Sequence, residues 1–380
     1  MKFIEDIVKQ EQKNQQIVCG DFFLSHRTLE TTIFILCDGI GSGVYANIAA
    51  ITCANRLLQL FQSGVSMQEA CTMVAASMED ARKTDIPFSA FTAVKILKDG
   101  QFTVYGYEVP SPLMIEYGSA RVLKSTYHQE GTQIIAESSG VLDIGDSLII
   151  LSDGVTQAGL GLKYPLGIGE AGISKFINKE ISSKTPIDEL PDKILALATT
   201  ENDGTFHDDT TVAVLNCRQA KELVILTGPP STKLKDREVV DKFINMPGIH
   251  AVCGSTTADI VSRELTRKIE IANRGRSIGV PPEYLIEGID IVSEGAIVLN
   301  QVFNILEEDP ELFTGASVVE KLCSLLHDAD SITIMVGMAV NEAHTDLSFK
   351  QLGVRPRHIT VNLIADVLRK KGKLVTIETY

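Results

Sequence analysis

Over its first 216 residues the chain alternates between short apolar runs and longer stretches with apolar residues every three or four positions. The run 31–37 (TTIFILC) ends at a glycine-rich turn and predicts a buried strand. Apolar residues at positions 44, 48, 51, 54, 58 and 61 then share one side of a predicted helix over 44–62. A second helix is expected at 67–83. Strands at 90–97 and 101–107 around Lys98-Asp99-Gly100 predict a hairpin.

The rest of this half continues with paired strands and paired helices. The further predicted strands are 113–117, 147–152 and 210–216, and the further predicted helices are 172–181 and 186–199. Because the strands neighbour one another and the helices come in separate pairs, we expect an α+β fold. Its form would be a β-sandwich covered by helices (αββα) rather than a parallel sheet.

After residue 217 single strands alternate with single helices. The predicted strands are 223–227, 249–253, 332–336 and 374–377, and the predicted helices are 236–245, 256–269 and 358–371. This alternation predicts a second, doubly wound α/β domain. The polar stretch 217–222 (CRQAKE) is typical of a linker, so we expect one domain at 1–219 and another at 220–380.

Composition and charge exclude several classes of protein. The 380 residues are 44% hydrophobic and 22% charged, which excludes a disordered or fibrous chain. The formal net charge is −14, and no cluster of Lys and Arg indicates nucleic acid or membrane as a partner. No apolar run approaches the roughly 18 residues of a membrane span, and the first 16 residues lack the layout of a secretion signal. Seven dispersed cysteines without a CxxC pair fit reduced thiols, so we expect a cytoplasmic protein without a zinc site.

Acidic residues lie at the ends of three predicted strands. Asp38 follows IFILC, Asp153 follows LIILS, and Asp208-Asp209 precede TTVAVL. Taken alone, each is more often a turn or a solvated loop than a metal ligand. Together they would repel one another unless a cation offset the charge, and oxygen ligands favour Mg²⁺ or Mn²⁺. Two such ions can activate a shared water and hold a phosphoryl group.

Four motifs place these acids in one ordered series. They are 18–23 (VCGDFF), 37–43 (CDGIGSG), 142–146 running into 150–155 (LDIGD and ILSDGV), and 207–211 (HDDTT). The series resembles the metal-dependent Ser/Thr protein phosphatases of the type 2C superfamily, in its bacterial SpoIIE-like branch. The glycine and proline connection at 106–115 (GYEVPSPLMI) is similar to the same branch. The resemblance covers about residues 17–216 and nothing after them.

The resemblance implies a bacterial signalling phosphatase that acts on a phosphoprotein. It would hydrolyse phosphoserine and phosphothreonine by direct attack of a metal-bound hydroxide, with two Mn²⁺ or Mg²⁺ ions as cofactors. By position, it implies that Asp38 bridges both ions, that the carbonyl of Gly39 binds the first, and that Asp153 and Asp208 hold the second. Asp21 would lie beside the first ion, and Asp209 would orient the ligands.

Two departures from the wider superfamily matter. Eukaryotic members place a histidine, thought to protonate the leaving alkoxide, where this chain has Ile40, so the general acid must be water or be absent. They also hold the substrate phosphate with an arginine that no motif locates here. Arg27 is a candidate, and the alternatives are that it belongs to a solvated turn or that phosphate contacts only the metals. A non-catalytic, phosphatase-like module that docks a signalling partner is the alternative function.

The second domain offers a candidate ligand site of its own. Gly228 follows one predicted strand, and Gly254, Ser255, Thr256 and Thr257 follow the next and open a helix. In doubly wound sheets, ligands bind beyond the carboxyl ends of strands, where helix N-termini attract anions. We therefore expect a small anionic ligand and a regulatory or ligand-binding role. Alternatively, Ser and Thr only cap the helix, or the domain has nucleotide or metabolite chemistry of its own. A homodimer is also left open.

Overall fold

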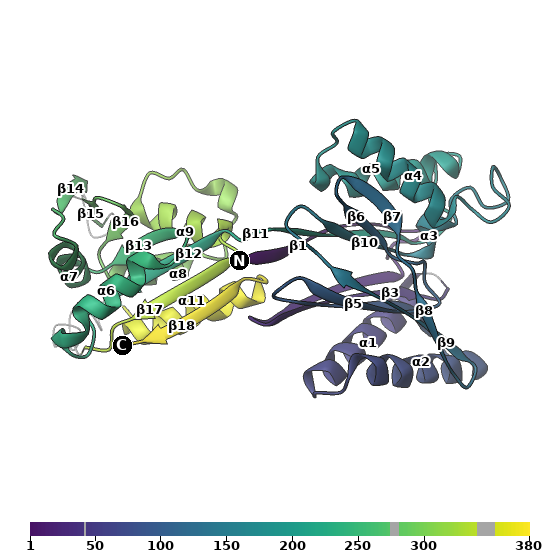
Figure 1. The fold of residues 1–380 in the computed structure, drawn as a ribbon, viewed down its shortest axis with the longest axis horizontal. Helices are drawn as coiled ribbons and strands as arrows, with labels where there is room; N and C mark the ends of the chain where they lie inside the picture. The colour runs from purple at the N-terminus through teal and green to yellow at the C-terminus, as the bar shows by residue number, and fades with distance from the viewer. Residues whose placement is uncertain (42, 274–280, 340–353) are drawn as a thin grey trace. The chain divides into compact units, whose positions relative to one another are not determined.

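The computed structural model describes residues 1–41, 43–273, 281–339 and 354–380. The chain divides into two compact units, Met1–Gln219 and Ala220–Tyr380 (Figure 1). Within the described ranges, no helix combines the length and the apolar character needed to cross a membrane. Ser42, part of the second motif, lies outside the described residues.

Two antiparallel sheets form the first unit. One has the order β1 (Lys2–Glu11), β11 (Thr210–Gln219), β10 (Ser147–Leu151), β6 (Leu113–Glu116) and β7 (Ser119–Val122). The other has the order β2 (Asp21–Arg27), β3 (Thr31–Gly39), β4 (Ser89–Leu97), β5 (Gln101–Tyr107), β9 (Gln133–Val141) and β8 (Thr126–Glu130). Neither sheet contains a parallel pair among the described strands, as the neighbouring strands in the sequence predicted.

The two sheets pack face to face, because apolar side chains alternate along their strands. On β3, Phe34 and Leu36 lie in the core between the sheets, whereas Ile33 and Ile35 lie on the opposite side. That opposite side is covered by α1 (Gly43–Gln62) and α2 (Met67–Lys83). The outer side of the other sheet is covered by α4 (Gly169–Ser182) and α5 (Leu190–Glu201). The layers are therefore helices, sheet, sheet and helices (Figure 1).

The second unit has one seven-stranded mixed sheet. Its order is β14 (Glu270–Asn273), β15 (Glu283–Ile286), β16 (Ile289–Ser293), β13 (Ile249–Cys253), β12 (Glu222–Thr227), β17 (Ser331–Val336) and β18 (Leu374–Thr379). The five strands from β16 to β18 are parallel, and β14 and β15 pair antiparallel at one edge. The antiparallel edge strands are short and were not predicted from the sequence.

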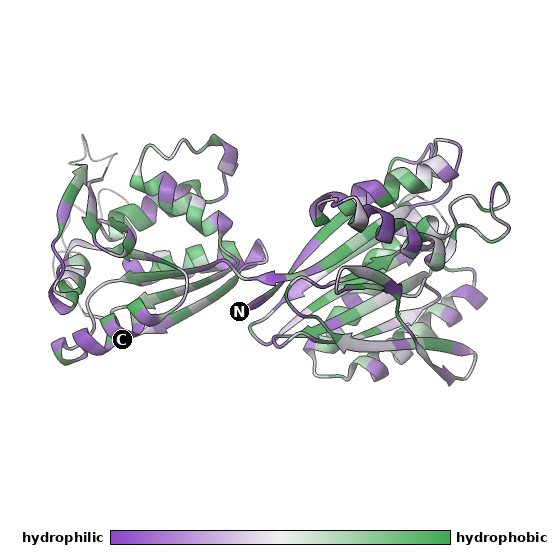
Figure 2. Cartoon of the chain, turned by 45° about the horizontal axis from the view of Figure 1, so that its top comes forward, coloured by the Kyte–Doolittle hydropathy of each residue, from purple (hydrophilic) through white to green (hydrophobic). Residues whose placement is uncertain are grey.

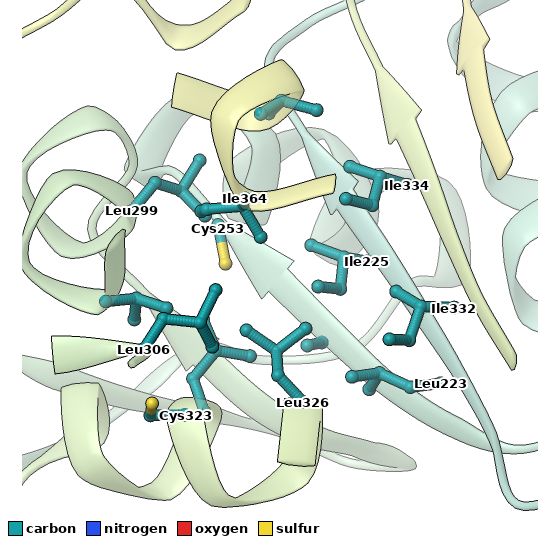
Figure 3. Close-up of a cluster of buried hydrophobic side chains, with 14 of the residues drawn as sticks. Leu223, Ile225, Cys253, Leu299, Leu306, Cys323, Leu326, Ile332, Ile334 and Ile364 are labelled. Carbon is teal, nitrogen blue, oxygen red and sulfur yellow. The ribbon is translucent and has the colours of Figure 1, made fainter. Parts of the chain in front are cut away.

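Helices cover both faces of this sheet. On one face lie α6 (Asp236–Asn245) and α7 (Ser255–Leu265); on the other lie α8 (Ala296–Ile305), α9 (Val318–Asp328) and α11 (Arg357–Lys370). Figure 3 shows the core under the second group, where Leu223 and Ile225 of β12 pack with Leu306 and Leu326. Apolar residues are concentrated in the strands of both units, and polar residues on the helix surfaces (Figure 2).

The remaining elements are single turns. They are α3 (Asp153–Thr156), η1 (Ile187–Glu189), η2 (Lys233–Lys235) and η3 (Pro310–Leu312). Among the strands that the sequence did not predict is β1, which pairs with β11 along its whole length although its sequence is largely polar. As an edge strand it leaves many side chains partly exposed, which explains why no apolar pattern marks it.

Candidate functional site

Two carboxylates lie side by side at the end of the sandwich core. Asp21 begins β2 and is directly opposite Asp38 of β3 in the antiparallel register. Directly opposite residues share a face of the sheet. Since Phe34 and Leu36 face the core between the sheets, Asp38 continues the same alternation at the strand's end. The apolar core therefore ends in an acidic pair.

The other sheet contributes hydroxyl groups to this pair. Thr211 of β11 donates its hydroxyl to Asp21 Oδ2 at 2.6 Å. The backbone N–H of Thr211 donates to Ser152 Oγ at 2.8 Å, and Ser152 directly precedes Asp153, the first residue of α3. These contacts connect the two sheets and position the start of α3 beside the acidic pair. Neither Ser152 nor Thr211 was among the predicted site residues.

Two glycines beside the acidic residues allow other segments to approach closely. A Cβ atom on Gly39 would lie 2.0 Å from the carbonyl oxygen of Ala46 in α1. A Cβ atom on Gly154 would lie 2.3 Å from the carbonyl oxygen of Asp209. Each glycine follows an aspartate of the site, so only the absence of a side chain lets these segments pack so closely.

The pKa values show that these carboxylates interact. Burial, then the nearby charges of Asp21 and Asp153, raise the pKa of Asp38 well above its ordinary value. Burial raises the pKa of Asp21 to about 7, although the hydroxyls of Thr211 and Ser152 offset part of the rise. Burial also raises the pKa of Asp153, where a hydrogen bond from Asp38 and the charge of Asp208 act in opposite directions. The predicted acids therefore converge on one electrostatic centre.

A lysine from the loop between β1 and β2 lies at this centre. Lys13 Nζ lies 3.6 Å from Asp208 Oδ1, and the backbone N–H of Lys13 donates to Asp209 Oδ1 at 2.9 Å. Asn14 N–H donates to the carbonyl of Phe206 at 2.9 Å, so the loop is attached to the segment before β11. A depression of about 260 Å³ lies between residues 11–16 and 204–206. No sequence motif singled out Lys13.

The donor atoms of the site suit a hard divalent cation. Asp21 Oδ1 and Asp209 Oδ2 are buried and accept no hydrogen bond. Buried acceptors without donors are costly, and carboxylate oxygens are the ligands that Mg²⁺ and Mn²⁺ prefer. Among the residues that the structure describes, no group of three or more His, Cys, Asp or Glu side chains is gathered as in a formed metal site. The suitability of this site for a divalent cation therefore rests on the two unpaired carboxylate oxygens and the mutual proximity of the acids.

The structure does not bring Arg27 to the acidic centre. Arg27 ends β2, six residues along the strand from Asp21, a span of about 20 Å. Its guanidinium pairs with Asp6, donates to the Ile4 carbonyl at 3.1 Å and packs over the ring of Phe3 at 5.3 Å. The side chain is only 8% exposed, which also differs from a solvated turn.

The candidate residues of the second unit do lie together. Gly228 follows β12, and its N–H donates to Thr257 Oγ1 in α7 at 2.9 Å. Gly254 is the N-cap residue of α7, and no side chain caps this helix end. Ser255 and Thr256 are the first two residues of the helix itself, so the alternative that they cap it is wrong.

Comparisons with known proteins were made over the whole chain. The sequence profile described as Stage II sporulation protein E (SpoIIE) matches residues 29–218. The RsbU and RsbW domains of a Mycobacterium tuberculosis protein are 21% identical over 63% of this chain and 68% of theirs, with a TM-score of 0.48. The PP2C phosphatase domain and regulatory fragment of SpoIIE from Bacillus subtilis are 16% identical over 57% of this chain and 64% of theirs, with a TM-score of 0.48. No curated protein sequence matches the chain.

Proposed function

The chain belongs to the SpoIIE family of PP2C-type phosphatases, and from this premise we propose that it removes phosphate from serine and threonine residues of a phosphoprotein. The observation that carries the proposal is the convergence of Asp21, Asp38 and Asp153, with two buried carboxylate oxygens left unpaired. A cluster of acids at the end of an apolar core is costly to stability. Such a cost is expected where a site must bind cations.

The proposed residue roles follow the order of the motifs. Asp38 and the carbonyl of Gly39 would hold one divalent cation, Asp38 would also bind a second, and Asp153 and Asp208 would complete the second set. Asp21 and Asp209 would keep these ligands oriented through their contacts with Thr211 and Lys13. When bound, Mn²⁺ or Mg²⁺ would offset the carboxylate charge and make water a better nucleophile toward phosphorus.

Hydrolysis at this site would proceed without a covalent enzyme intermediate. The oxygen of a water molecule forms the new bond to phosphorus, the bond from phosphorus to the serine or threonine oxygen breaks, and the departing oxygen takes a proton. Ile40, two residues after Asp38 and 42% exposed, has no proton to give. The proton would therefore come from solvent water.

The test compares the full chain with two carboxylate variants. With Mn²⁺ present, we expect hydrolysis of p-nitrophenyl phosphate and of a phosphoserine peptide, and none with a chelator. Asp38→Asn and Asp153→Asn should each lower kcat/KM by about 100-fold or more, because each removes a charged ligand. Asp80→Asn, at an 80% exposed position on α2, is the matched control and should keep full activity. Equal activity in all four proteins would contradict the proposal.

A non-catalytic docking module is the second candidate, and Ile40 in place of a histidine favours it. Turnover separates the two functions, and calorimetric titration with Mn²⁺ shows whether cations bind. Mn²⁺ binding together with turnover supports the phosphatase. Mn²⁺ binding, or its absence, without any turnover of either substrate supports the docking module. For residues 220–380 we propose a regulatory, ligand-binding role.

A further inference from the structure

The parallel strands of the second unit have an order with a defined switch point. Numbered along the chain from β12, they lie in the order third, second, first, fourth and fifth, that is β16, β13, β12, β17 and β18. β13 and β16 lie on one side of β12, whereas the later strands β17 and β18 lie on its other side. In open α/β sheets, ligands bind beyond the carboxyl ends of the strands at such a point. Here those ends are Thr227 and Val336.

An arginine lies at this point. Arg357, the first residue of α11, places Nη1 3.4 Å from the carbonyl oxygen of Gly337. A Cβ atom on Gly228 would lie 1.9 Å from the same Nη1. Gly228 and Gly337 are the residues that directly follow β12 and β17. The guanidinium therefore lies over the two strand ends. It occupies space that a side chain at position 228 would otherwise fill.

The charge of Arg357 has no acidic partner in the described part of the chain. Its Nε is buried and donates no hydrogen bond. Burial lowers the pKa of Arg357, and the buried thiol of Cys253 offsets part of this shift. A half-buried cation without a counter-charge is costly, because most buried charges are paired. A bound anion is the partner that would offset this cost.

Backbone donors gather at the same edge of the sheet. α7, α8 and α11 all begin after the carboxyl ends of parallel strands, and no side chain caps any of their N-termini. The N-cap residues of α7 and α8 are close together, since a Cβ on Gly295 would lie 3.2 Å from the Cα of Gly254. The first N–H groups of a helix have no partner within the helix. They are available to an acceptor.

We propose that this edge of the second unit binds the phosphate group of a small molecule, with Arg357 as its counter-charge and the start of α7 as its N–H donor. Phosphate is favoured over carboxylate because its additional oxygens can accept from both the guanidinium and the helix N-terminus. Free phosphate and a phosphate-bearing metabolite share this chemistry. The proposed site is separate from the phosphatase centre and does not depend on its activity.

Calorimetric titration of the full chain tests the site. Chelator is present, so that the acidic centre of the first unit holds no cation that could bind phosphate. The probes are inorganic phosphate and adenosine monophosphate, with adenosine as the uncharged control. We expect binding of at least one phosphate probe and none of adenosine. Equal affinities identify free phosphate as the ligand, and tighter binding of the nucleotide identifies a phosphate-bearing metabolite. Absence of binding by both phosphate probes would overturn the proposal.

Two variants assign the binding to Arg357. Arg357→Gln should weaken phosphate binding by about tenfold or more, as expected when one charge-assisted hydrogen-bonded pair is lost. Arg355→Gln is the matched control, because this arginine stacks over the ring of Phe303 instead, and it should bind phosphate as the parent protein does. Unchanged affinity in Arg357→Gln, or an equal loss in both variants, would overturn the assignment.

Thermal unfolding distinguishes a binding role from a structural one. Without phosphate, Arg357→Gln should melt at the same temperature as the parent protein or higher, since the variant no longer buries an unpaired charge. A lower melting temperature together with parent-like phosphate affinity would show a structural role and refute the proposal. Should Arg357→Gln fail to fold, Arg357→Lys retains the charge without the planar fork. It is expected to bind phosphate more weakly than the parent protein, and equal affinity would contradict the role of the guanidinium.

Discussion

Asp21 and Asp38 are directly opposite each other on β2 and β3, at the point where the core between the two sheets ends. Asp21 is only 2% exposed, and one of its carboxylate oxygens accepts no hydrogen bond. Like charges directly opposite one another destabilise a strand pair. The position of these two carboxylates is therefore explained by what they bind, and not by any contribution to the stability of the sheet.

The first prediction concerns the pH dependence of the metal-free protein. The pKa of Asp21 is raised to about 7 in the folded state by burial, against an ordinary value of 3.8. Between these two values the folded state binds a proton that the unfolded chain has released. The free energy of unfolding therefore falls as pH rises, by up to about 1.4 kcal/mol per pH unit for this group. Asp21→Asn removes the effect.

Thermal unfolding in chelator, from pH 4.5 to 7.5, checks this sign. The melting temperature of Asp21→Asn relative to the parent protein should rise across that range and level off above pH 7. Addition of Mn²⁺ at pH 7.5 should stabilise the parent protein more than the variant, because cation binding favours the charged carboxylates. A melting temperature of the variant that stays constant or falls relative to the parent protein as pH rises would show that Asp21 is not held protonated by the fold.

The second prediction concerns Gly39. Gly39→Ala should destabilise the protein by several kcal/mol and abolish Mn²⁺-dependent hydrolysis, because the new Cβ meets the Ala46 carbonyl oxygen at 2.0 Å. Gly64→Ala is the control: Gly64 follows α1 with a positive φ of 84°, and a Cβ there meets no atom within 4 Å. The control should cost about 1 kcal/mol and leave activity intact. Urea unfolding and p-nitrophenyl phosphate turnover measure both, and similar losses in the two variants would argue against the close approach of α1.

The third prediction separates stability from catalysis at Arg27. Arg27→Ala should lower the free energy of unfolding by about 3 kcal/mol, because it leaves Asp6 without its partner and removes packing over Phe3 and Phe34. KM for a phosphopeptide, measured below the melting temperature, should not change. Arg56→Ala, at an exposed position on α1, controls for the loss of one positive charge. An increase in KM in Arg27→Ala but not in Arg56→Ala would instead show that Arg27 binds the substrate phosphate.

The elements that the sequence predicted best have a clear apolar pattern. β3 and α1 match the predicted run at 31–37 and helix at 44–62 within two residues, because β3 is an apolar run buried on both faces and α1 buries one face. α8 was missed because it is buried on almost all sides and so lacks a period of its own. β1 was missed for the opposite reason, since its polar side chains are exposed at a sheet edge.

The residues of the candidate site also differ in how well the sequence predicts them. Asp38 and Asp153 could be located because an acidic residue followed by glycine at the end of an apolar strand is a pattern that the sequence itself contains. Lys13 and Thr211 could not, because they reach the site through register and a hydrogen bond from another segment. Arg357 can be recognised only when the strand order of the second unit is known, since it begins α11, far from Gly228 in the sequence.

The last prediction assigns a substrate contact to Lys13, as the proposed phosphatase activity requires a cation near the phosphate. Its ammonium lies 3.6 Å from Asp208 Oδ1, and both side chains are about 40% exposed. Exposed ion pairs of this kind contribute at most about 1 kcal/mol, so the ammonium can turn to a substrate phosphate at little cost. Lys13→Gln should therefore raise KM for a phosphopeptide by about three- to tenfold with little change in kcat, while Lys13→Arg retains most of the affinity. Because Lys13 competes with cations for Asp208, Mn²⁺ affinity in Lys13→Gln should stay level or increase; a fall in kcat or in Mn²⁺ affinity with unchanged KM would instead place Lys13 in the support of the metal ligands.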